Sequence, residues 1–136
     1  MSYSGKFKPK NYKKYKGDPT KIYYRSLWER RFMVYCDNNS KIIEWGSEEI
    51  IIPYKSPLDK KTHRYFPDFY VKYINKDKQV VREIIEVKPK RHLSPPKEPK
   101  RKTQRYLNEV ATYIKNKAKF KAAEEFCKDR KYGFRI

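Results

Sequence analysis

The pattern of hydrophobic residues along this 136-residue chain predicts both helices and strands. A first helix is expected from Ser26, which is a good N-cap, to about Asp37. Its apolar stripe, at the spacing of helical turns, consists of Trp28, Phe32, Tyr35 and Cys36. Thr103 caps a later helix, and a further helix is expected from about Ala118 to Asp129. The apolar stripes of these two helices are Leu107, Val110 and Ile114, and then Ala122, Ala123 and Phe126.

Three strands are expected between these helices, after a short extended piece at 42–45. The first strand covers 48–54, where three consecutive isoleucines favour a pleated surface. The second covers about 63–73, with an edge, a bulge or a break at Pro67, because proline lacks the N–H that a ladder bond needs. The third covers about 80–87 and is apolar near its end, as expected of a central strand covered on both faces.

The connections between these elements predict the topology. The polar segment 75–79 is expected to fold the second and third strands into an antiparallel hairpin. Residues 88–102 hold four prolines among seven basic residues, so we expect a long basic loop there rather than helix or strand. A last short strand is expected at 133–136. This order predicts an α/β fold with a mixed sheet flanked by helices, in one domain at 22–136.

Residues 1–21 show neither the helical nor the strand period. They contain seven lysines and one aspartate, with aromatic rings at Tyr3, Phe7, Tyr12 and Tyr15. We expect a basic, extended N-terminal arm. Two interpretations stay open for it: contact with DNA or a partner, or a solvated tail whose rings pack on the domain.

Charge narrows the choice of partner. The chain carries 35 Lys and Arg against 16 Asp and Glu, a formal net charge of +19, yet 16% of its residues are aromatic, which excludes a simply disordered polycation. A folded polyanion binder fits both facts, with nucleic acid as the leading partner and an anionic membrane as the weaker one. The sequence has no apolar run suited to a membrane span or a secretory signal, so an intracellular protein is expected.

The cysteines and histidines predict no zinc site. Cys36 and Cys127 stand far apart, outside any Cys-x-x-Cys pair, and are expected to be small helix residues that face the core. His63 and His92 are too few and too scattered, and are interpreted as surface or phosphate-contacting residues.

Two carboxylates and a lysine occupy adjoining strand positions. Asp68 directly follows Pro67, and Glu86 and Lys88 end the third strand. Because successive side chains of a strand alternate between its faces, Glu86 and Lys88 should point to the same side. The predicted hairpin then brings Asp68 within reach of Glu86. The alternative is an ordinary cross-strand salt bridge on a solvated face.

This group has the chemistry of a metal-dependent phosphodiesterase. Asp68 and Glu86 offer hard oxygen ligands for Mg²⁺, or for Mn²⁺ in its place, and the backbone carbonyl of Val87 adds another. Metal coordination lowers the pKa of a bound water, while Lys88 orients that nucleophile and stabilises the charge growing on the phosphate.

Glu29, on the first turn of the 26–37 helix, has two interpretations. Ser26 to Glu29 matches a capping box, in which Glu29 reaches back to the Ser26 amide. A carboxylate at this position also completes a metal site when the helix packs against the sheet, and we assign Glu29 this assisting role in catalysis and metal binding. Glu48 and Glu49 are weaker substitutes for it.

Basic residues of the arm and of the proline-rich loop are expected to hold the DNA backbone. They are Lys6, Lys8, Lys10, Lys13, Lys14, Arg64, Lys90, Arg91, Lys100, Arg101 and Lys102, with Gln104 and His63 as accessory neighbours of the site.

Glu29, Pro67-Asp68 and Glu86-Val87-Lys88 together resemble the motif of the PD-(D/E)xK nuclease superfamily. A closer resemblance, over almost the whole chain, is to the head-completion nucleases of large contractile-tailed phages. It is carried by the arm Tyr3-Ser4-Gly5-Lys6-Phe7, by Ile51-Ile52-Pro53-Tyr54, by His63-Arg64-Tyr65-Phe66 and by Glu86-Val87-Lys88-Pro89-Lys90. The chain also resembles, more weakly, the transposase subunit that cuts at transposon ends.

The resemblance implies a restriction-endonuclease-like fold and Mg²⁺-dependent DNA cleavage that leaves 5′-phosphate and 3′-hydroxyl ends. It implies a role in finishing the DNA-filled phage head, in the host cytoplasm during assembly or in the virion, with head or portal proteins as partners. A homodimer would make double-strand cuts easier.

Two competing interpretations stay open. One is a noncatalytic head or DNA-binding protein that retains a nuclease-like fold. The other is an RNA-binding protein of ribosomal type, which explains the charge but not the acidic pair beside Lys88. The sequence stops at Ile136, directly after the last expected strand, so a shortened C-terminus is a further possibility.

Overall fold

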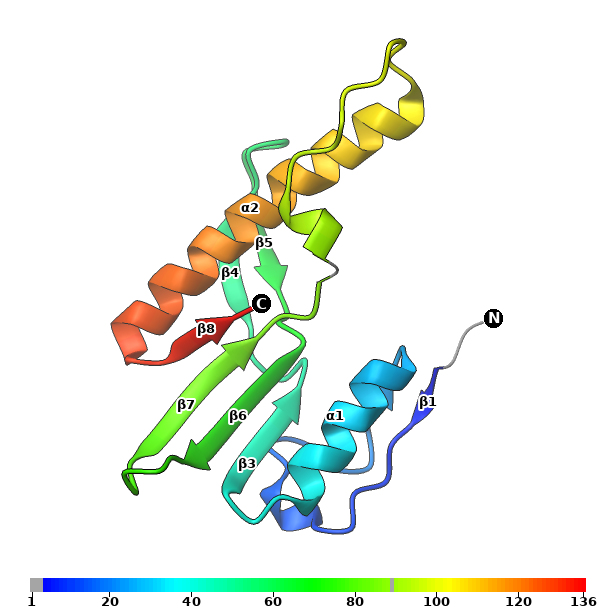
Figure 1. The fold of residues 1–136 in the computed structure, drawn as a ribbon. Coiled ribbons are helices and arrows are strands. Elements are labelled where there is room, and N and C mark those ends of the chain that lie inside the picture. The colour runs from blue at the N-terminus through cyan, green and yellow to red at the C-terminus, as the bar shows by residue number, and fades with distance from the viewer. Residues whose placement is uncertain (1–3, 89) are drawn as a thin grey trace.

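A four-stranded mixed sheet forms the centre of the molecule (Figure 1). The computed structural model describes residues 4–88 and 90–136, with the backbone alone for residues 90 and 91. The sheet order is β3-β6-β7-β8, with bounds Ile42–Ser47, Phe69–Ile74, Val80–Ile85 and Gly133–Arg135. The first three strands are antiparallel neighbours and β8 runs parallel to β7. The predicted mixed sheet is confirmed.

The predicted β6–β7 hairpin is confirmed, and its turn sets the register. Asn75 Oδ1 accepts hydrogen bonds from the backbone N–H groups of Asp77 and Gln79, at 3.0 and 2.9 Å. Pairing then runs from Ile74 opposite Val80 to Phe69 opposite Ile85. The residues just beyond the last pair, at the end away from the turn, are therefore neighbours in space.

Two helices cover opposite faces of this sheet, α1 (Leu27–Asn38) and α2 (Gln104–Arg130). Met33 and Cys36 of α1 pack with Ile85, whereas Cys127 of α2 packs with Ile84. Since neighbouring strand residues point to opposite faces, β7 is covered on both sides, as predicted. Both cysteines are buried free thiols, which confirms their predicted place in the core.

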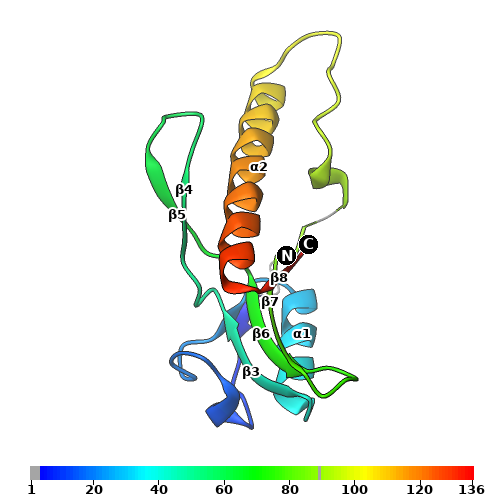
Figure 2. The ribbon, with the colours of Figure 1, turned by 90° about the vertical axis from the view of Figure 1, so that its left-hand side faces the viewer.

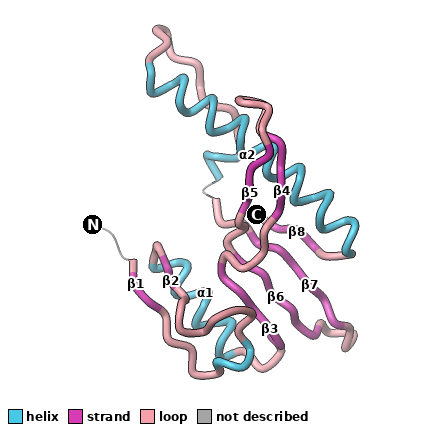
Figure 3. Tube along the Cα trace, turned by 180° about the vertical axis from the view of Figure 1, so that it is seen from behind, coloured by secondary structure: helices cyan, strands magenta, loops and turns pink. Residues whose placement is uncertain are grey.

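A second hairpin, β4 (Ile52–Lys55) with β5 (Thr62–Tyr65), packs on α2 through Tyr54, Tyr65 and Ala123 (Figure 3). The predicted strand at 48–54 begins only at Ile52. Glu48, its expected first residue, takes a left-handed backbone conformation with φ of 56°, which is incompatible with a strand. The predicted strand at 63–73 breaks at Pro67, and its two halves, β5 and β6, lie in different sheets.

The two helices predicted after residue 103 are one continuous helix, α2, since neither Gly nor Pro interrupts the segment. The stripe predicted for its first half is wrong, because Leu107 and Ile114 are exposed. The stripe predicted for its second half is confirmed, with Ala123 buried and Ala122 and Phe126 packed beside it. The N-terminal half of α2 projects beyond the central sheet, so that sheet does not cover it (Figure 1). The basic loop before it was predicted to hold no helix, but its backbone forms a short 3₁₀ helix, η2 (Lys90–Leu93).

The predicted stripe of α1 is also partly wrong. Trp28 and Tyr35 are exposed, while Met33 and Cys36 are fully buried. Trp28 instead stacks on Phe32, with ring centroids 5.7 Å apart. The buried face of α1 thus lies to one side of its aromatic residues.

Residues 4–21 do not form the expected extended arm. They contain β1 (Gly5–Lys6) and η1 (Tyr12–Lys14), and β1 pairs with β2 (Tyr23–Tyr24). Phe7 and Tyr15 are buried in the α1 side of the core, both against the Trp45 ring. The second interpretation, rings packed on the domain, describes this segment.

Candidate active site

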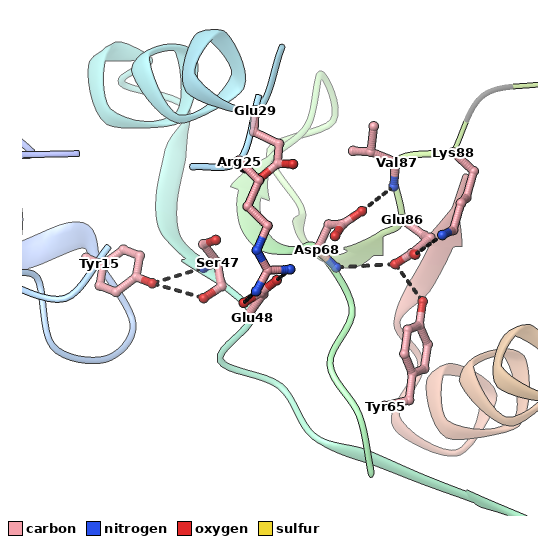
Figure 4. Close-up of polar contacts among 10 residues, drawn as sticks. All are labelled: Tyr15, Arg25, Glu29, Ser47, Glu48, Tyr65, Asp68, Glu86, Val87 and Lys88. Atoms are coloured by element: carbon pink, nitrogen blue, oxygen red, sulfur yellow. Dashed lines mark hydrogen bonds and ion pairs between the residues drawn. The ribbon is translucent and has the colours of Figure 1, made fainter. Parts of the chain in front are cut away.

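Asp68 and Glu86 meet where β6 begins and β7 ends (Figure 4). The Tyr65 hydroxyl donates a hydrogen bond of 2.7 Å to Glu86 Oε2, and the Asp68 backbone N–H donates one of 3.3 Å to the same oxygen. The Val87 N–H donates to Asp68 Oδ2 at 2.7 Å. Backbone and phenol donors therefore fix both carboxyl groups, and the predicted approach of Asp68 to Glu86 is confirmed.

Both carboxyl groups are held in an environment that disfavours their charge. Burial raises the pKa of Asp68, and the Val87 N–H and Lys88 oppose this rise. Burial also raises the pKa of Glu86, the charge of Asp68 raises it further, and the Tyr65 hydrogen bond and Lys88 oppose the rise. A pair of buried carboxylates that repel each other is an arrangement that a bound cation stabilises.

Lys88 stands on the same side of the chain as Glu86, as strand alternation predicted. Its Nζ lies 3.9 Å from Glu86 Oε1, and 29% of its side chain is exposed. The ammonium is thus close enough to the carboxylate pair to act on the same substrate group and open enough for that group to reach it.

The structure places a second lysine, Lys119 of α2, beside the site. Its Nζ lies 5.6 Å from the centre of the Tyr65 ring and 5.9 Å from that of Tyr54. Burial lowers its pKa, and the charge of Lys88 lowers it further. Nothing in the sequence distinguishes Lys119 from the other lysines of this helix, because the hairpin that carries the two rings comes from a distant part of the chain.

Glu29 is oriented by the start of α1. Its backbone N–H donates to Ser26 Oγ at 3.1 Å, and its Oε2 accepts a hydrogen bond of 3.3 Å from the Arg25 N–H. The predicted capping interaction is therefore present, with the Arg25 amide in place of the Ser26 amide.

Glu48, treated above as a weaker substitute, lies at the edge of the same site (Figure 4). Its backbone N–H donates to the Asp68 carbonyl at 3.1 Å, and its carboxylate pairs with Arg25 at 2.8 Å. Burial raises the pKa of Glu48; Arg25 opposes this rise, while the charges of Asp68 and Glu29 add to it. The three carboxylates of Glu29, Glu48 and Asp68 thus share one electrostatic environment.

The acidic pair fits a hard cation that brings its own waters. Within residues 4–88 and 90–136, no three His, Cys, Asp or Glu side chains are grouped so as to hold a metal by themselves. Zinc sites generally need three or four such ligands. Mg²⁺ is commonly held by one or two carboxylates, with waters and substrate phosphate completing its shell, so Asp68 and Glu86 suit it.

Comparison with known proteins decides the family. The family model described as the N-terminal domain of TnsA-like endonucleases matches residues 39–136. The chain belongs to the TnsA-like endonucleases. It is also 44% identical, over 140 residues, to the head completion nuclease of Enterobacteria phage T4, an alignment that covers 100% of this chain and 91% of that protein. No solved structure matches the chain.

These matches confirm the resemblance to both kinds of nuclease and the restriction-endonuclease-like fold. The family match spans the central sheet, α2 and the group formed by Asp68, Glu86 and Lys88. The phage T4 protein is similar along the whole length, so that likeness includes α1 and Glu29.

Two predicted accessory residues of this TnsA-like endonuclease lie outside the site. His63 Nε2 is 2.7 Å from Asp59 Oδ2, in the outer part of the β4–β5 hairpin. Gln104 Nε2 donates to Asn108 Oδ1 at the start of α2. At 1.5 Å per residue, Gln104 is about 22 Å along the helix from Lys119. The structure brings neither residue to Glu86.

The predicted DNA-binding residues fall into three groups. Side chains on the surface are those of Lys6, Lys8, Lys10, Lys13, Arg64, Lys100, Arg101 and Lys102. Lys14 is engaged internally, because its Nζ donates to three carbonyls at the end of α1. The side chains of Lys90 and Arg91 lie outside what the structure describes. In the part that it does describe, no helix is long and apolar enough to cross a membrane.

Proposed function

We propose that this endonuclease hydrolyses DNA phosphodiester bonds with a divalent cation, Mg²⁺ or Mn²⁺, and acts in the completion of a phage head. The observation that carries the proposal is the convergence of Asp68, Glu86 and Lys88 at one end of the β6–β7 hairpin.

Asp68 and Glu86 would hold the cation, with the Val87 carbonyl as a further oxygen ligand and Glu29 or Glu48 as an assisting carboxylate. Bound Mg²⁺ would neutralise charge on the phosphate and lower the pKa of a water. Tyr65 and the backbone amides keep the two carboxyl groups in place before any substrate arrives. This pre-orientation supports a catalytic site over a simple surface salt bridge.

Lys88 has the direct role toward the substrate. In the hydrolysis, water attacks phosphorus, the P–O3′ bond breaks, and the products are a 5′-phosphate and a 3′-hydroxyl. Negative charge grows on the phosphate oxygens during this step, and an ammonium positioned there stabilises it. Lys119, partly buried beside Glu86, adds a second positive charge at the same place.

The wider molecule supports a DNA substrate and an assembly role. A net charge of +19 provides the field that draws a polyanion to the site. The 44% identity to a head completion nuclease supports a role in completing the DNA-filled head, in the host cytoplasm or in the virion. Head or portal proteins are then the expected protein partners, and a homodimer would allow cuts in both strands.

Nicking of supercoiled plasmid DNA by the purified protein tests the activity. We expect cleavage with Mg²⁺ or Mn²⁺, none in EDTA, and a loss of about a hundredfold or more in Lys88→Ala, because an electrostatic donor at the phosphate is removed. Lys121→Ala removes an exposed lysine of α2 that has no role in the proposed site, and should leave the rate unchanged. Activity untouched by Lys88→Ala would refute the assignment.

Metal binding gives a second measurement that does not depend on turnover. Titration calorimetry with Mn²⁺ should show a site in the unaltered protein that is lost in Asp68→Asn and in Glu86→Gln. Circular dichroism serves as the check that both variants are folded. Unchanged Mn²⁺ affinity in these variants would remove Asp68 and Glu86 from the metal site.

A further inference from the structure

A groove opens between the proline-rich loop and the N-terminal half of α2, and Lys88 lies in its wall. Its volume is about 1010 Å³. Figure 2 shows the loop on one side of α2 and the β4–β5 hairpin on the other. The groove therefore lies on the loop side of α2, away from the β4–β5 hairpin, and reaches Lys88.

The helix face that lines the groove continues the face that α2 uses for packing. Asn116, Ala123 and Cys127 are the buried residues of α2, at helical spacing. The same stripe, followed toward the N-terminus, passes through Thr112, Glu109 and Arg105, all of which line the groove. Over the sheet this stripe is apolar, with Ala123 and Cys127. Beside the loop its residues are polar, so burial of apolar surface does not explain them.

The groove walls carry groups that recognise a nucleic-acid strand. Lys88 and Lys97 are cations suited to phosphates, and Tyr113 offers an aromatic ring on which a base can stack. Arg105 adds a further cation, which pairs with Glu109 at 3.3 Å. Thr112 and Asn116 supply hydroxyl and amide groups that hydrogen-bond to bases.

We propose that this groove binds a single DNA strand that continues from the phosphate at Lys88. A few nucleotides of one strand fit such a volume, whereas a duplex would have to force the loop away from α2. The inference rests on the proposed function, because it places the scissile phosphate at Lys88. It identifies the substrate class: DNA in which duplex passes into single strand, at an end or a fork.

Binding measured without catalysis tests the groove. Fluorescence anisotropy in EDTA would follow a fluorescein-labelled oligothymidylate and, separately, a labelled duplex of the same length. Thr112→Trp fills the groove, and Lys97→Glu reverses a charge on the exposed loop without touching the helix. We expect each to weaken single-strand binding about tenfold, the size of one lost stacking or phosphate contact, and to leave duplex binding within about twofold.

Matched controls carry the same changes outside the groove. Ile114→Trp places a tryptophan at an exposed position of α2, and Lys121→Glu reverses a charge at another exposed position of that helix. The proposal is overturned if the controls weaken single-strand binding equally, if duplex binding falls as much, or if neither groove variant has an effect. If Thr112→Trp does not fold, the single-strand affinities of Lys97→Glu and Lys121→Glu are compared with each other, and this comparison decides the proposal.

The outcome stays distinct from that of the proposed function. If the unaltered protein fails to nick plasmid DNA but its single-strand affinity depends on Thr112 and Lys97, the groove stands and the hydrolytic assignment fails. If nicking depends on Lys88 but both groove variants bind single-stranded DNA as tightly as the unaltered protein, the nuclease assignment is supported and the groove proposal fails.

Discussion

Two segments of this endonuclease are similarly rich in lysine and arginine but differ in how they pack on the fold. Residues 4–22 pack into the core through Phe7, Tyr15 and Ile22. Residues 92–102 contain no aromatic residue, and their one large apolar side chain, Leu93, is exposed. Lysine content alone therefore does not identify a DNA-binding segment. The buried rings decide which segment belongs to the fold and which remains on the surface.

The sharpest test of this contrast is to remove the largest apolar side chain from each segment. Phe7→Ala should lower the free energy of unfolding by about 3–5 kcal/mol, because it leaves a cavity against Trp45. Leu93→Ala should change it by less than about 0.5 kcal/mol, as expected of an exposed position. Urea unfolding measures both. A comparable loss in the two variants would mean that the loop is packed as firmly as the N-terminal segment.

The next test measures how much the loop lysines contribute to DNA binding. Lys100→Ala/Lys102→Ala should reduce the slope of log K against log salt by about 1.8 and weaken duplex DNA binding by roughly tenfold, if each lysine neutralises one phosphate. The matched control, Lys41→Ala/Lys76→Ala, removes two charges near the turn end of the β6–β7 hairpin, away from the site. An equal fall in slope for both pairs would indicate that net charge alone, rather than the loop, governs affinity.

Local features of the sequence were enough to predict the end of the hairpin where the acidic pair meets. The Asn75 turn, the alternation of Glu86 and Lys88, and the break at Pro67 all act over a few residues, and the structure has each of them. These features bring Asp68 to Glu86 without information from elsewhere in the chain. The acidic pair was therefore predictable from sequence.

Features that depend on a distant partner were not predictable. The stripe Leu107-Val110-Ile114 has helical spacing, but its direction depends on where the sheet ends, and two of its members are exposed. Lys119 joins the site only because Tyr54 and Tyr65 pack beside it. Glu48 approaches Asp68 through a left-handed backbone conformation that favours Gly, and Glu is a poor signal of it.

The smallest expected effect is a difference in the free energy of unfolding between variants of two adjacent lysines, Lys13 and Lys14. Lys14 Nζ donates to the carbonyls of Cys36, Asp37 and Asn39 at 2.8, 3.1 and 2.8 Å, and so satisfies groups that the end of a helix leaves open. Lys14→Met keeps the stem but removes the ammonium, so it should cost about 1–2 kcal/mol in urea unfolding.

Lys13→Met is the matched control, because Lys13 is exposed in the same short helix, η1, and its loss should cost less than about 0.5 kcal/mol. The salt dependence of DNA binding should show no change for Lys14→Met, since an ammonium bound to three carbonyls is not free to meet a phosphate. If Lys14→Met instead lowers the slope of log K against log salt by about 1 and leaves the free energy of unfolding unchanged, Lys14 binds DNA as first predicted. In that case the rings of residues 4–22 would still belong to the core, but Lys14 would contact DNA, as the loop lysines are expected to do.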